Sequence, residues 1–141
     1  MKKIFNSSSE KDTQLLAKDV AKSMDQHNVV CLYGELGAGK TTFVKSFAKA
    51  LGVQSRIISP TYVLIRTYNT GNNLQLFHID AYRINVEKDT HEIEEILAQD
   101  NAIIVIEWAD RISSILPKKR IDIEFINKNN NEREIEITRF L

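Results

Sequence analysis

The chain has 141 residues, of which 43% are hydrophobic and 27% charged, and these are ordinary values for a globular protein. Lysine plus arginine equals 19 and aspartate plus glutamate equals 19, so a net charge of zero argues against a generic nucleic-acid binder. The single cysteine, Cys31, excludes an intrachain disulfide and a cysteine-rich zinc site, and no apolar run is long enough to span a membrane. We expect one domain over residues 1–141 in a reduced, cytoplasmic protein without a signal peptide.

The first half of the sequence predicts two helices around a buried strand. In chain order these are a helix that Ser8 or Ser9 caps and that runs to about Met24, an apolar strand over 28–33 (NVVCLY), a glycine-rich turn over 34–39, and a helix over 40–51 that ends at Gly52. The strand is apolar throughout, which is typical of a sheet covered on both faces.

The second half predicts two hairpins, an acidic helix and another buried strand. They are a hairpin over 61–68 and 74–79, a helix over 86–99, a strand over 103–106 (IIVI), and a closing hairpin over 120–126 and 132–138. This order indicates a three-layer α/β domain whose mixed sheet is partly parallel and carries antiparallel hairpins.

Charge is distributed unevenly along the chain. Residues 36–79 contain five bases and no acid, whereas residues 80–110 contain nine acids and only two bases, Arg83 and Lys88. A basic stretch suits a polyanionic ligand, and an acidic stretch suits a metal or a basic partner. The alternative is two solvated faces with chance clustering of charge.

A phosphate-binding motif follows the first predicted strand. Residues 34–41 (GELGAGKT) match the pattern G-x-x-x-x-G-K-[ST], and they lie between a buried strand and an amphipathic helix, as the motif requires. Backbone N–H groups of such a loop wrap a phosphate, while Lys40 reaches the β- and γ-phosphates, Thr41 binds magnesium and Thr42 reaches the α-phosphate. The predicted nucleotide-binding residues are Glu35, Leu36, Gly37, Ala38, Gly39, Lys40, Thr41 and Thr42. The alternative is a glycine-rich turn with an exposed lysine.

Four motifs in order resemble the TsaE family, formerly called YjeE. They are 34–43 (GELGAGKTTF), 59–64 (SPTYVL), 78–83 (HIDAYR) and 107–108 (EW). The resemblance implies a P-loop NTPase-like fold and a magnesium-dependent ATPase, weak alone, that is required for threonylcarbamoyladenosine in tRNA. It also implies ATP and Mg²⁺ as cofactors and the TsaB and TsaD proteins as partners. We expect tRNA to be bound only indirectly or weakly, and no membrane or other small-molecule substrate to be involved.

Two carboxylates end apolar runs and are candidates for the metal site. Asp80 ends LQLFHID and Glu107 ends IIVIE, and the resemblance implies that both face the active site. Our hypothesis is that Asp80 holds magnesium, directly or through water, while Glu107 orients the attacking water or a water on the metal. Which of them contacts the metal directly stays open. The alternative for each is a surface ion pair at a strand end.

Further residues of the motifs are weaker candidates. Thr61, after Pro60, is predicted to offer its hydroxyl to magnesium near the γ-phosphate, unless it only opens a strand. Candidates for coupling the nucleotide state to a partner are Trp108, His78 and Arg83. Their structural alternatives are an indole in the core or an interface, a structural histidine and a structural ion pair. His27 and His91 are expected on the surface.

Two other functions compete with the ATPase hypothesis. One is a small nucleoside or nucleotide kinase, although no arginine-bearing lid is evident after Ile112. The other is a nucleotide-binding interaction module without relevant turnover. The run Asn127–Asn130 resembles a guanine-reading motif but lacks its aspartate, so we interpret it as a hairpin turn and favour adenine over guanine.

Overall fold

The computed structural model describes residues 1–24, 27–35, 39–58, 64–129 and 132–141. Within these ranges, seven strands form one sheet in the order β1-β7-β6-β2-β5-β4-β3. The strands are β1 (Lys2–Ser7), β2 (Val29–Tyr33), β3 (Ile65–Asn69), β4 (Gln75–Asp80), β5 (Ala102–Glu107), β6 (Ile121–Asn129) and β7 (Glu132–Arg139). The helices are α1 (Glu10–Lys22), α2 (Lys40–Ala50), α3 (Val86–Leu97) and the 3₁₀ helix η2 (Ala109–Ile115).

The sheet is mixed, as the sequence predicts. Strand β2 pairs in parallel with both β5 and β6, and β4 pairs in parallel with β5. The outer pairs β3–β4, β6–β7 and β1–β7 are antiparallel. Every residue of β5 (AIIVIE) is buried, which explains why its sequence is continuously apolar up to the final glutamate.

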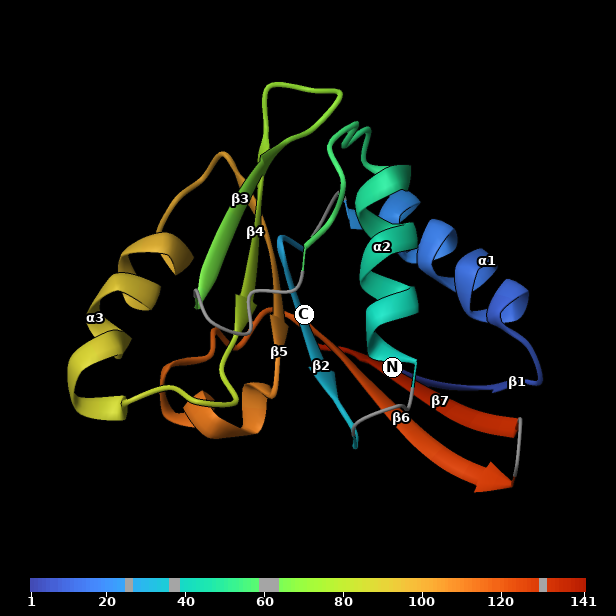
Figure 1. Cartoon of the computed structure of the whole chain (residues 1–141). Coiled ribbons are helices and arrows are strands. Elements are labelled where there is room, and N and C mark those ends of the chain that lie inside the picture. The colour runs from blue at the N-terminus through green and yellow to red at the C-terminus, as the bar shows by residue number, and fades with distance from the viewer. Residues whose placement is uncertain (25–26, 36–38, 59–63, 130–131) are drawn as a thin grey trace.

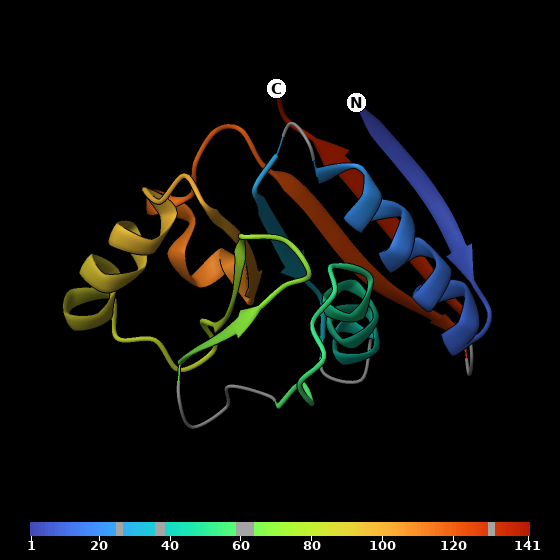
Figure 2. The ribbon, with the colours of Figure 1, turned by 90° about the horizontal axis from the view of Figure 1, so that it is seen from above.

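Helices cover both faces of the sheet and make three layers. Helices α1 and α2 lie on one face, and α3 with η2 lies on the other (Figures 1 and 2). Successive residues of a strand point to opposite faces, so Leu32 packs in the cluster that contains Phe43, whereas Cys31 packs in the cluster that contains Ile93. The three-layer α/β architecture is therefore confirmed.

The predicted helix boundaries are close to the observed ones. Ser9 caps α1, its side chain accepting a hydrogen bond from the N–H of Asp12 at 3.3 Å. Beyond α2, Gly52 adopts φ +92°, a left-handed conformation that favours glycine. Of the described helices, none is long and apolar enough to cross a membrane.

Strand β1 was not predicted. Its residues are exposed except for Ser7, so the polar segment carries no pattern of burial that would reveal a strand. It forms because β7 offers a free edge, to which β1 adds with Lys2 opposite Thr138 and Ser7 opposite Arg133. This pairing is tertiary, and sequence periodicity does not report it.

Two smaller expectations were also wrong, and one short helix was missed. The short helix η2 was not predicted. Strand β6 continues through Asn127 to Asn129, with a register shift there, so these residues lie in the strand and not in a turn. His27 is buried, not on the surface, and its Nε2 lies 2.8 Å from the carbonyl oxygen of Phe140. The predicted strand over 61–68 begins at Ile65 among the described residues, and residues 61–63 lie outside them.

Candidate functional site

Two glycines of the phosphate-binding motif, Gly34 and Gly39, have positive φ. Gly34 follows β2 with φ +139°, and a Cβ on it would lie 2.7 Å from the carbonyl oxygen of Phe125. Gly39 precedes α2 with φ +102°. These two positions therefore need glycine for conformation, and Gly34 also for space. Glu35 between them is exposed, whereas Leu36, Gly37 and Ala38 lie outside the described residues.

Helix α2 begins without the side-chain cap and the acidic residues that are present at the starts of α1 and α3. Gly39 provides no side-chain cap, and the first turn of α2 contains no acidic residue. By contrast, Ser9 and Asn85 cap α1 and α3, and both of those helices carry acids in the first turn. The first N–H groups of α2 have no intrahelical acceptor, so this helix start suits an anion. Thr41 is exposed there and Thr42 is partly buried.

The side chain of Lys40 is buried between Gly34 and Trp108. Its Nζ donates a hydrogen bond of 2.6 Å to the carbonyl oxygen of Gly34 and lies 3.7 Å from the centroid of the Trp108 ring. Lys40 is only 4% exposed. The motif lysine thus links the start of the loop to the residue that follows β5.

Burial lowers the pKa of Lys40. The nearby carboxylates of Glu107, Asp80 and Asp110 oppose that effect by favouring the charged form. The site therefore has acidic side chains close to the lysine, although no ion pair to it is recorded among the described residues.

Asp80 and Glu107 lie side by side, as the hypothesis requires. They are the last residues of β4 and β5 and are direct partners in the parallel register. The carboxyl ends of parallel strands meet at one edge of a sheet, and β2 leads into the phosphate-binding motif at that same edge. Asp80 is partly exposed, and its Oδ1 accepts a hydrogen bond of 3.0 Å from the N–H of Tyr82.

His78 contacts Glu107 directly. Its Nε2 lies 2.6 Å from Oε2 of Glu107, and both side chains are buried. The Nδ1 atom of His78 is buried and has no hydrogen-bond partner in the part of the chain that the structure describes. His78 therefore belongs to the site through Glu107, although no contact with Lys40 is recorded.

Trp108 forms an aromatic pair that the sequence analysis missed. Its ring centroid lies 4.8 Å from that of Tyr82, and the guanidinium of Arg111 lies 5.4 Å from the Tyr82 ring. Tyr82 belongs to the motif HIDAYR, which was a signal for it, whereas nothing in the sequence singles out Arg111. Arg83 is exposed in the turn after β4, and none of the described contacts joins it to this group.

Another missed residue, Arg133, approaches the motif from β7. A Cβ on Gly39 would lie 3.5 Å from its Cδ. Thr61 lies outside the described residues, so its predicted metal role stays a prediction. No cluster of three or more histidine, cysteine, aspartate or glutamate side chains that would hold a metal is found among the residues described.

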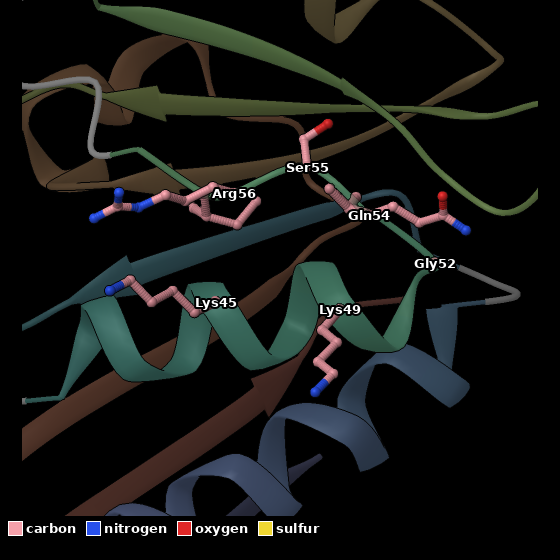
Figure 3. Close-up of a pocket in the computed structure, with 8 residues that line it drawn as sticks. Lys45, Lys49, Gly52, Gln54, Ser55 and Arg56 are labelled. Carbon is pink, nitrogen blue, oxygen red and sulfur yellow. The ribbon is translucent and has the colours of Figure 1, made fainter.

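A basic hollow lies beside α2. It has a volume of about 590 Å³, and its lining includes Lys45, Lys49 and Arg56 but neither Lys40 nor the two carboxylates. Figure 3 shows the side chains of Lys45 and Arg56 extending in the same direction, while Lys49 points away from them. Three of the five bases in the acid-free stretch therefore gather around one hollow.

Comparisons with known proteins identify the family. The sequence profile described as "Threonylcarbamoyl adenosine biosynthesis protein TsaE" matches residues 7–135. The chain belongs to the TsaE family. This family is one of tRNA threonylcarbamoyladenosine biosynthesis, so the resemblance inferred from the four motifs is confirmed.

Relatives of the TsaE family match most of the chain. The tRNA threonylcarbamoyladenosine biosynthesis protein TsaE of Bacillus subtilis is 38% identical over 127 residues, covering 90% of this chain and 79% of that protein. The protein of the same name from Treponema pallidum is 36% identical, covering 93% of this chain and 96% of its own. The crystal structure of Bacillus subtilis YdiB matches with a TM-score of 0.83 and 32% identity, covering 100% of this chain and 87% of that one.

Proposed function

We propose that this member of the TsaE family is a cytoplasmic, magnesium-dependent ATPase that serves the modification of tRNA with threonylcarbamoyladenosine. The observation that carries the proposal is the arrangement at one sheet edge. There the uncapped start of α2, with Gly39 and Lys40, lies near the paired carboxylates Asp80 and Glu107. Residues 1–141 would act as one P-loop ATPase domain.

The residues at this edge fit ATP and magnesium. The free N–H groups of α2 and the Lys40 ammonium are donors suited to phosphates, with Thr42 close behind in the same turn. The exposed hydroxyl of Thr41 and the carboxylate of Asp80 are oxygen ligands of the kind that magnesium prefers. When bound, magnesium would neutralise charge on the β- and γ-phosphates.

The different surroundings of the two carboxylates support separate roles. Asp80 is the more exposed, and its Oδ1 is oriented by the N–H of Tyr82, which suits a metal ligand. Glu107 is 8% exposed and is oriented by His78, which suits a group that positions a water. We therefore propose that Asp80 holds magnesium and that Glu107 orients water, with Thr61 as a further metal ligand.

We propose TsaB and TsaD as the partners, as the family resemblance implies. A net charge of zero favours tRNA being held mainly by those partners and not by this chain. Turnover is then expected to be slow alone and to be coupled to the partner complex. Trp108, which contacts Lys40, is a suitable residue to link nucleotide state to a partner surface.

The test is ATP turnover with and without purified TsaB–TsaD complex. We expect slow magnesium-dependent hydrolysis that the partners change, and Lys40→Ala should lower it by about 100-fold or more. Lys22→Ala removes an exposed lysine of α1 and is the matched control, with turnover like that of the unchanged protein. Hydrolysis that stays absent with both partners present would instead favour a binding module without turnover.

A further inference from the structure

The ammonium of Lys40 is held by two contacts that are unrelated to phosphate. It donates to the carbonyl oxygen of Gly34 at 2.6 Å and faces the Trp108 ring at 3.7 Å. Because Lys40 is buried, these contacts replace much of the hydration that its charge would have in water. A cation over an indole is the strongest of the common cation–π pairs, and it strengthens when water is excluded.

Several neighbours fix the indole in this position. Trp108 has φ 58° and ψ 42°, a left-handed conformation that is unusual for a bulky residue. Its carbonyl oxygen accepts a hydrogen bond of 3.0 Å from the N–H of Arg111, and its ring packs against Tyr82. A strained backbone persists where its surroundings determine it strongly, and such residues gather at functional sites.

We propose that the Lys40 ammonium binds to the face of the Trp108 ring when no nucleotide is bound. The indole then competes with the phosphates of the nucleotide for this ammonium. The inference rests on the proposed nucleotide binding, and it adds that Trp108 controls the affinity for the nucleotide. To bind the β- and γ-phosphates, the ammonium has to leave the indole and the Gly34 carbonyl. The free energy of those contacts is then subtracted from nucleotide affinity, so Trp108 weakens binding and favours release.

The chain contains one tryptophan, which makes this competition directly measurable. Growth on 5-fluoro-, 5,7-difluoro- or 4,5,6,7-tetrafluorotryptophan alters Trp108 alone. Each added fluorine withdraws electron density from the ring face and weakens its attraction for a cation, while the ring keeps nearly the same shape. The probe is magnesium with the non-hydrolysable ATP analogue AMP-PNP, and its Kd is measured by calorimetry for each protein.

We expect the Kd to fall stepwise with fluorination, by between about twofold and thirtyfold across the series. In the Lys40→Ala background, residual binding should show no such trend, because the competing ammonium is gone. Thermal unfolding of each protein checks that the fold is retained.

Three outcomes would overturn the inference, and they are distinguishable. A Kd that stays constant means that the indole does not compete for Lys40. A Kd that rises means that Trp108 instead holds Lys40 ready for the phosphate. If the unsubstituted protein binds no AMP-PNP, the proposed ATPase function fails and this inference fails with it.

Discussion

Nε2 of His78 lies 2.6 Å from Oε2 of Glu107, so a histidine on β4 orients the carboxylate that ends β5. His78 and Asp80 are two residues apart on one strand and share a face, and Asp80 is the register partner of Glu107. Two adjacent strand ends thus provide one carboxylate open to solvent and one held by an imidazole. The proposal that Asp80 holds magnesium and that Glu107 orients water depends on this difference in exposure and contacts.

The contact between His78 and Glu107 predicts different effects for two amide substitutions. The side-chain nitrogen of glutamine reaches about as far as Nε2 of histidine, whereas that of asparagine reaches only about as far as Nδ1. We expect His78→Gln to keep ATP turnover within a few-fold, and His78→Asn to lower kcat by about 10- to 100-fold. Steady-state ATPase assays measure this, and thermal unfolding controls for the buried amide. Equal losses in both variants would contradict a positioning role.

The two carboxylates should respond differently to isosteric substitution. Asp80→Asn keeps the oxygen that accepts from Tyr82 but removes the charge, so the magnesium concentration for half-maximal activity should rise by about tenfold or more. Glu107→Gln should lower kcat by about 100-fold with little change in that concentration. A magnesium titration of the ATPase activity separates the two cases. The reverse pattern would exchange the assigned roles.

The Cys31 thiol predicts a loss of stability at alkaline pH. Burial, together with the carboxylate of Asp122, raises the pKa of Cys31 from 9.0 to about 12. The pKa of this thiol is higher in the folded state than in the unfolded state. The stability that the protonated thiol contributes is therefore fully present below pH 9 and is lost progressively as pH rises from 9 towards 12.

We therefore expect ionisation of this thiol to lower the free energy of unfolding by about 1 kcal/mol as pH rises from 8 to 10. Urea unfolding under reducing conditions measures it. Cys31→Ala is the control, and its stability should fall by about that much less over the same pH interval. Parallel pH profiles of stability for the two proteins would show that burial does not raise the pKa of this thiol.

Gly52 and Gly71 form a matched pair for a stability measurement. A Cβ on Gly52 would lie 2.5 Å from the backbone nitrogen of Gly71, and Gly52 has φ +92°. A Cβ on Gly71 would come no closer than 3.5 Å to Gly52, which is an ordinary contact. We expect Gly52→Ala to lower the unfolding free energy by about 2 kcal/mol or more, and Gly71→Ala by about 1 kcal/mol at most. Urea unfolding of both variants tests this, and equal losses would refute the steric reason.

The parts of the molecule predicted from sequence are those with a strong local pattern. The strand before Gly34 is a continuous apolar run because it is buried on both faces of the sheet, and the helix after Gly39 carries a helical period because one of its faces is buried on the sheet. Asp80 and Glu107 became candidates because each ends an apolar run, and the resemblance to the TsaE family implied that both face one site. Local patterns were sufficient for the centre of the sheet, and the candidate site at its edge also needed the motifs that resemble the TsaE family.

The parts that were missed depend on contacts between distant segments. Strand β1 exists through its ladder with β7, and His27 is buried because the chain end at Phe140 covers it. The approach of Arg133 to Gly39 likewise joins the closing hairpin to the phosphate-binding motif. No local period encodes such pairings, so a single sequence does not reveal them.

Strand β2 has three strands on either side of it in the sheet, and it is the only bridge between those two halves among the described strands. Separating the halves means breaking its ladder with β5 or with β6, so amide hydrogens of Val30–Leu32 should be among the slowest to exchange with solvent. The phosphate-binding motif starts directly after this strand. Gly34, the first residue of that motif, is therefore attached to the segment that local opening is expected to reach last, so the start of the motif has a fixed position in the fold.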